Sequence, residues 1–289
     1  MRLYPFKKES FRWFGGILAI AGIVFIALRL RDYGAEIDFS RFDTASWTLV
    51  IGLALAYGMD NLMLALAWYN LLAYFDVDVK ISWSIKVYGI SHLSRYLPGN
   101  IFHLTGRQVL SMADGIQSWP LVKSTIWELW LISFTGALFS LLALPLLIPS
   151  ISGSVAISIF LFMVIATIGF FQLFHGSRVA GAMGCYVGFL LISAITFICL
   201  IYMVSVIHLP DGVYWINICG AYVLAWLAGL LTPGAPAGLG VRELVLMLLL
   251  RGIMMEHNII LSVLLARLVT VLGDFIFFMI ASINYYRNS

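Results

Sequence analysis

The chain contains a series of apolar runs, each about as long as a helix must be to cross a lipid bilayer. A spanning helix takes roughly 20 mostly apolar residues, because each residue adds about 1.5 Å and the hydrocarbon core is about 30 Å thick. Trp and Tyr stand at several ends of these runs, as is typical of side chains at the membrane interface. The sequence therefore predicts an all-α, polytopic membrane helix bundle. The six clear runs are residues 13–28, 47–74, 119–144, 151–173, 180–207 and 259–285.

The composition supports the same class of protein. Hydrophobic residues make up 62% of the chain and charged residues 11%, against about 25% charged in a typical soluble domain. The net charge of +3 is small and the basic residues form no stripe, so we expect no nucleic-acid partner. Cys185, Cys199 and Cys219 lie in apolar runs without ligand spacing, which predicts buried thiols and no metal site. No nucleotide-binding or hydrolase motif occurs, so we expect neither a cofactor nor catalysis.

Two further apolar regions, residues 81–113 and 213–254, are broken in the middle by Pro and Gly. Lys and Arg concentrate in the N-terminal segment and around residues 80–123, which predicts that these parts and both termini are cytoplasmic. Successive loops must alternate between the two sides of the membrane, and the predicted sides are consistent only if neither broken region adds a crossing. The simplest solution makes each a re-entrant hairpin, and the alternative counts them as full spans, giving seven or eight crossings. A re-entrant backbone needs cover from protein or water, so we expect both hairpins at the centre.

The two breaks share a pattern. The first reads LPGNIFHLTGR (residues 97–107) and the second TPGAPAGLGVR (residues 232–242), and in each an Arg follows the Pro by nine positions. With the predicted topology, residues 1–144 and 151–289 form two pseudo-repeats of opposite orientation within a single transmembrane domain. Inverted repeats with broken helices are typical of transporters. Coincidence is the alternative, since Pro-Gly and one Arg are easily matched.

Each break predicts an anion site. Pro and Gly stop a helix, and the helix that begins after them has free N–H groups at the positive end of its dipole. Free N–H groups beside a guanidinium suit a phosphate group. Non-specific contact of interfacial arginines with lipid headgroups is the other interpretation. The predicted headgroup-binding residues are Arg107, Arg242, Arg267, His103 and Asn100, and the predicted helix breaks are Pro98, Gly99, Pro233, Gly234, Gly238 and Gly240.

Several charged residues lie within apolar sequence. A charge at the bilayer centre costs about 2.5–3.5 kcal/mol on insertion scales, so such groups usually pair with one another or line a polar path. Arg267 and Asp274 are seven residues apart and share one helix face. Asp60 and Glu128 are candidates to pair with the arginines. Purely structural ion pairing is the alternative for the whole set, which consists of Asp60, Glu128, Glu243 and Asp274.

The segments SRYLPGNIFHLTGRQVLSMADG (residues 94–115) and PGAPAGLGVRELVLMLLLRG (residues 233–252) resemble a known family. They are similar to the flippase-like transmembrane domain of lysylphosphatidylglycerol synthases and of its stand-alone relatives, and the resemblance covers nearly the whole chain. It implies movement of lipids between leaflets, and in some stand-alone relatives a place beside glycolipid or polyprenyl-phosphate pathways. The sequence holds no soluble aminoacyl-transferase domain, so the resemblance does not imply synthase activity.

These observations favour a lipid flippase or transporter for a phosphate-bearing lipid, either a phospholipid or a polyprenyl-phosphate-linked one. The alternative function is a membrane-embedded enzyme or accessory subunit of lipid-linked glycan or phospholipid metabolism. A scaffold without transport of its own is a third hypothesis. The expected partners are a membrane lipid and a glycosyltransferase or lipid-synthesis protein. The expected location is the plasma membrane of a bacterium or archaeon.

Overall fold

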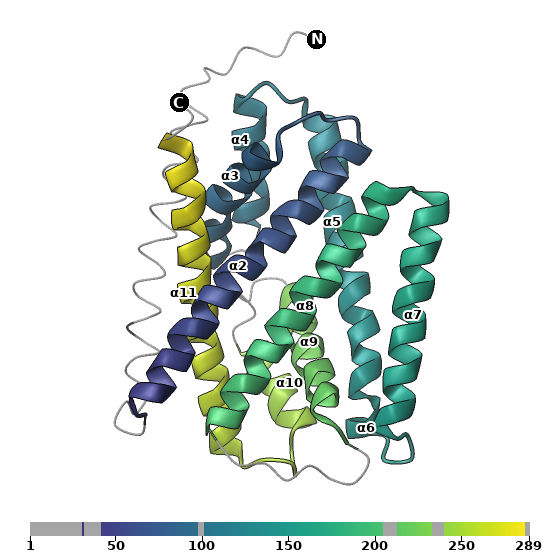
Figure 1. The fold of residues 1–289 in the computed structure, drawn as a ribbon, viewed down its shortest axis with the longest axis vertical. Helices are drawn as coiled ribbons and strands as arrows, with labels where there is room; N and C mark the ends of the chain where they lie inside the picture. Colours follow the sequence, from purple (N-terminus) through teal and green to yellow (C-terminus); the bar gives the residue numbers. More distant parts are fainter. Residues whose placement is uncertain (1–30, 32–41, 98–100, 205–212, 233–239, 287–289) are drawn as a thin grey trace.

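The chain folds into an all-α helix bundle (Figure 1). The computed structural model describes residues 31, 42–97, 101–204, 213–232 and 240–286, with side chains as far as residue 283, and every regular element in these ranges is helical. Five helices are long and apolar enough to cross a membrane. These are α2 (Thr44–Tyr74), α5 (Ser118–Phe139) with its continuation through η3 (Ser140–Ala143) and α6 (Leu144–Leu147), α7 (Gly153–Phe174), α8 (Ser177–Val204) and α11 (Glu256–Tyr286).

Five of the six predicted spans are thereby confirmed, and the first, residues 13–28, lies outside the described residues. The bundle also has the surface of a membrane protein. Large apolar side chains stay exposed along α7, where Phe162 is 68% exposed and Leu173 is 82% exposed. In water such a surface would associate or aggregate, whereas lipid tails cover it without cost.

Both broken regions form pairs of short helices. The first consists of α3 (Ile81–His92), the short 3-10 helix η2 (Leu93–Tyr96) and α4 (Phe102–Ala113), and the second of α9 (Trp215–Leu231) and α10 (Val241–Leu249). The four α-helices comprise 12, 12, 17 and 9 residues, all fewer than the roughly 20 that a full span requires. In each region the two helices pack against each other.

The two pairs enter the bundle from opposite ends. In Figure 1, α3 and α4 lie in the upper half of the bundle, and α9 and α10 lie in the lower half. The long helix α2 ends at the upper end, where α5 begins, and α8 ends at the lower end, where α11 begins. Each broken region thus returns to the end from which it started, which favours the two-hairpin arrangement over seven or eight full spans. The inverted relation between residues 1–144 and 151–289 stays a prediction.

Glycines let α2 and α11 approach closely. A Cβ atom built on Gly273 of α11 would lie 2.8 Å from the carbonyl oxygen of Ala54 and 2.9 Å from the amide nitrogen of Gly58, both on α2. A Cβ atom on Gly58 would in turn lie 3.0 Å from the carbonyl oxygen of Gly273. Helices in lipid associate through such packing because burial of apolar surface supplies little driving force there. This contact positions Asp274, the residue after Gly273, against α2.

We expect Gly273→Ala to destabilise the bundle by about 1–3 kcal/mol, because the added methyl group would overlap the α2 backbone. Gly52→Ala is the matched control, since a Cβ atom at Gly52 of α2 meets no other atom within 4 Å. The measurement is thermal unfolding of the purified protein in mild detergent. A melting temperature for Gly273→Ala equal to that of the control would show that the helices do not cross here.

Candidate functional site

The helix that follows the second break places Arg242 inside the bundle. Helix α10 begins at Val241 after Gly240, whose φ of 82° lies in the left-handed region that glycine tolerates. No side chain caps this helix, and Glu243 in its first turn complements the positive end of the helix dipole. Arg242 is therefore held one residue inside the start of α10. Of the predicted break residues, Pro98, Gly99, Pro233, Gly234 and Gly238 lie outside the described residues, as does Asn100.

Three arginines line one pair of adjoining cavities, here called the arginine pocket. Arg242 and Arg267 line both cavities together with Thr270. Arg95, from the end of the first broken region, lines one of them. The other side chains of the pocket are Tyr57, Tyr96, Val271 and Asp274 in one cavity and Phe197, Tyr222, Leu246, Val263 and Ala266 in the other.

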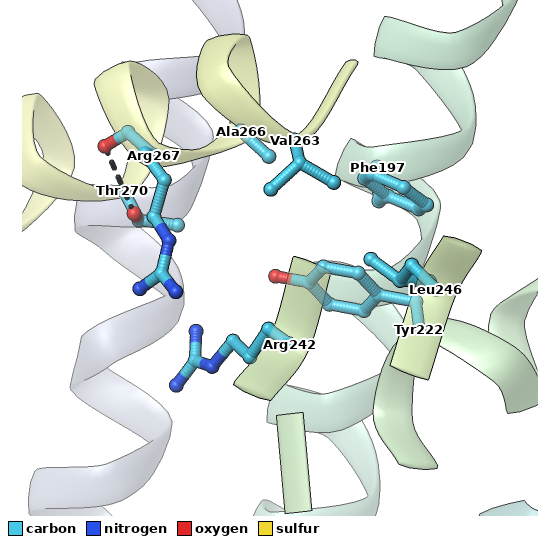
Figure 2. Close-up of a pocket in the computed structure, with 8 residues that line it drawn as sticks. All are labelled: Phe197, Tyr222, Arg242, Leu246, Val263, Ala266, Arg267 and Thr270. Carbon is cyan, nitrogen blue, oxygen red and sulfur yellow. Dashed lines mark hydrogen bonds between the residues drawn. The ribbon is translucent and has the colours of Figure 1, made fainter. Parts of the chain in front are cut away.

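Figure 2 shows how these groups face one another. The guanidinium groups of Arg242 and Arg267 point towards each other, and the hydroxyl of Tyr222 points to the same side. The cavities measure about 20 and about 10 Å³, each room for about one water molecule. A phosphate group is larger than either cavity, so its binding requires these side chains to move apart.

The charges in the pocket are not equally compensated. Arg267 donates to Glu243 from Nη2 at 3.1 Å and from Nε at 3.3 Å, which joins α11 to α10. Arg242 forms no ion pair with any described residue. Its guanidinium carbon lies 5.9 Å from the ring centre of Trp226, and its Nε is buried without a hydrogen-bond partner. Two facing guanidinium groups repel each other, so an anion between them would be attracted strongly.

Asp274 holds the third arginine of the pocket and three further groups. Its Oδ1 accepts from Asn61 at 2.9 Å and contacts His92 Nε2 at 3.1 Å. Its Oδ2 accepts from the Tyr96 hydroxyl at 2.6 Å and from Arg95 at 3.4 Å. The carboxylate is only 1% exposed, so these donors replace the water it has lost. Asp274 thus ties α2, α3 and η2 to α11 beside the pocket.

Arg107 lies outside the arginine pocket, in an ion pair with Glu128 of α5. The pair is bidentate: Arg107 Nη1 donates to Oε1 of Glu128 at 3.1 Å and Nη2 donates to Oε2. The Tyr88 hydroxyl donates to the same Oε1 at 3.0 Å. The guanidinium of Arg107 also packs on the rings of Trp68 and Tyr88, at 4.7 and 4.6 Å from their centres. The Arg107 head is therefore committed to protein partners.

Two other predicted site residues have few partners. His103 of α4 has a buried Nδ1 without a hydrogen-bond partner and does not line the arginine pocket. Asp60 of α2 is 3% exposed and accepts one hydrogen bond, from Ser193 at 3.1 Å, while its Oδ1 has none. No Lys, Arg or His of the described chain pairs with Asp60, so it is not in one of the ion pairs that the sequence suggested.

Sequence reasoning missed several residues of the pocket. Arg95 and Tyr96 stand directly before the first break, inside the motif that carries the family resemblance, so a signal for them was present. Tyr57 and Tyr222 lie within apolar runs, and nothing in the sequence separates them from interfacial tyrosines.

Comparison with known proteins adds no assignment. No protein-family model matches the chain, and no curated protein matches its sequence. Among the residues that the structure describes, no group of three or more His, Cys, Asp or Glu side chains is placed to hold a metal ion.

The Arg107–Glu128 pair gives a prediction about stability. Arg107→Met leaves a buried carboxylate without its cation, so we expect it to cost about 3–5 kcal/mol of unfolding free energy. The double variant Arg107→Met/Glu128→Met should cost less than the sum of the two single losses. Thermal unfolding in detergent measures all three, with the exposed Lys80→Met as the control. Additive losses would show that the two side chains do not interact.

Proposed function

We propose that this chain is a lipid flippase or transporter that moves a phosphate-bearing lipid between bilayer leaflets. The observation that carries the proposal is the arginine pocket. The guanidinium of Arg242 points at Arg267 inside the helix bundle. Arg242 forms no ion pair with a carboxylate of the described residues and instead lies near the ring of Trp226. Arg242 is half-buried and its Nε has no hydrogen-bond partner. A cation without a partner inside a membrane bundle is costly, and membrane lipids supply anionic headgroups.

The pocket suits a phosphate group of a single negative charge. Among the described residues its three arginines stand against two carboxylates, Asp274 and Glu243, so the positive charges exceed the negative charges by one. A guanidinium donates forked hydrogen bonds that match phosphate oxygens. The hydroxyl of Tyr222 lines the same space and offers a further donor, whereas the Thr270 hydroxyl donates to the carbonyl oxygen of Arg267 at 3.1 Å.

Both broken regions contribute to the pocket, which supports transport rather than simple binding. Arg95 and Tyr96 are the last two residues of η2, before the first break, and Arg242 follows the second break. Because the cavities hold only about a water molecule each, the two regions have to separate to admit a headgroup. Rocking of one half of the chain against the other would open the pocket to each leaflet in turn, while acyl chains stay in lipid.

The membrane location is multi-pass, and its finer details belong to the same proposal. We place the chain in a bacterial or archaeal plasma membrane with both termini in the cytoplasm. Helices α3, α5 and α8 begin at the upper end of the bundle in Figure 1, and Lys80, Lys123 and Arg178 lie at or close to these helix starts in the sequence. Residues 148–152, which join α6 to α7 at the lower end, carry no charge. Membership of the flippase-like family, and a partner in lipid or lipid-linked glycan synthesis, are proposed from the two motifs.

Transport of a labelled phospholipid in proteoliposomes tests the proposal. We expect Arg242→Ala to slow transbilayer movement about 10–100-fold, because a hydrogen bond to a charged group is worth about 1.5–3 kcal/mol. Arg242→Lys should keep part of the rate, since an ammonium retains the charge but not the fork. The control is Arg251→Ala, which removes an exposed arginine outside the pocket. A wild-type rate in folded Arg242→Ala would exclude the headgroup role.

A further inference from the structure

One buried acidic group takes no part in the lipid site described above. Asp60 stands near the middle of the 31-residue helix α2, more than 20 Å along the helix from either end by its rise per residue. Its side chain is 3% exposed. Its Oδ2 accepts a hydrogen bond from the hydroxyl of Ser193 on α8, and its Oδ1 accepts none.

No cation compensates this carboxyl group in the described part of the chain. Ser193 is the group that contacts it from α8. The buried charged groups on its other neighbouring helices are already engaged: Asp274 and Arg267 on α11, His92 on α3 and Glu128 on α5. From α9, Tyr222 lines the arginine pocket together with Arg242 and Arg267.

A carboxyl group in such a place has one simple way to avoid an uncompensated charge. It can take a proton from a hydronium ion, which gives a neutral acid and a neutral water molecule, and the reaction reverses when its surroundings change. The protonated group is also a donor, and the Ser193 hydroxyl oxygen, 3.1 Å from Oδ2, is an acceptor within its reach. This chemistry needs no metal and no further side chain.

We propose that Asp60 is a proton-binding site whose occupancy is coupled to the binding of an anionic headgroup in the arginine pocket. The coupling is electrostatic. The positive field of the arginines favours the carboxylate form, and an anion in the pocket cancels that field, so that Asp60 takes up a proton. Linkage is reciprocal, so a proton on Asp60 strengthens headgroup binding by the same factor.

The geometry supports this coupling through two short connections. Tyr57 of the pocket lies one turn before Asp60 on α2. Asn61, the next residue, donates to Asp274 of the pocket. The coupling to headgroup binding rests on the proposed function. It also gives that function a source of energy, the proton gradient. One proton that moves with one singly charged lipid makes the transported unit neutral.

The test for coupling uses proteoliposomes with a pH difference and a labelled phosphatidylglycerol. With one proton per lipid, the wild-type steady-state ratio of label between leaflets should shift by up to about tenfold per pH unit. In Asp60→Asn, a neutral group of equal shape, the label should still move but the shift should vanish. The control is Asp43→Asn, which removes an exposed carboxylate at the start of α2 and should keep the shift.

A second measurement needs no lipid and no transport. Infrared difference spectra between acid and alkaline pH should contain a protonated-carboxyl band that disappears in Asp60→Asn. Ser193→Ala should shift the frequency of the same band, because it removes the hydroxyl that hydrogen-bonds to the Asp60 carboxyl group. Should Asp60→Asn fail to fold, the displacement in Ser193→Ala decides whether the band belongs to Asp60.

The two measurements separate this inference from the proposed function. An Asp60 band in a protein that moves no lipid would support the proton site and contradict the lipid role. Lipid movement that depends on Arg242 but shifts equally with pH in wild type and Asp60→Asn would overturn the inference. A shift driven by a sodium gradient in place of the pH difference, or the absence of an Asp60 band, would overturn it as well.

Discussion

A carboxylate buried among apolar helices has to find its hydrogen bonds inside the protein, because no water replaces them there. Asp274 meets this constraint with donors from three segments far away in the sequence, Asn61, His92 and the Arg95–Tyr96 pair. The first broken region is thereby held against α11. Since Gly273 brings α11 close to α2, the same contact fixes where the arginine pocket can form.

The charged side chains inside the bundle differ in whether they have an ion-pair partner, and this difference separates those with a structural role from those proposed to bind a ligand. Arg107 has Glu128, Arg267 has Glu243 and Arg95 has Asp274, so each of these cations is balanced within the chain. Among the described residues, Arg242 and Asp60 have no such partner, and they carry opposite charges. They do not pair with each other, and we propose that they bind two different ligands, a phosphate group and a proton. A membrane protein that transports an anion at the expense of a proton gradient needs both.

Much of the fold could be predicted from the sequence because hydrocarbon demands long apolar helices whatever their neighbours are. The span predicted at residues 119–144 and the observed Ser118–Leu147 differ by only one to three residues at each end. Pro and Gly act locally, and α9 ends at Leu231 and α10 begins at Val241, on either side of the second predicted break. The ion-pair partners of the buried charged residues could not be predicted from the sequence. Which carboxylate meets Arg107 depends on how α4 packs on α5, and Arg95 joined the site only because η2 carries it to α11.

The central claim is that arginines from both broken regions form one site for a phosphate-bearing lipid. Native mass spectrometry of the protein purified in mild detergent tests it most directly, because the bound lipid is weighed with the chain. The account predicts one retained phosphate-bearing lipid per chain, and its loss in Arg242→Gln but not in Arg251→Gln. A wild-type protein that carries no such lipid, or equal retention in both variants, would contradict it.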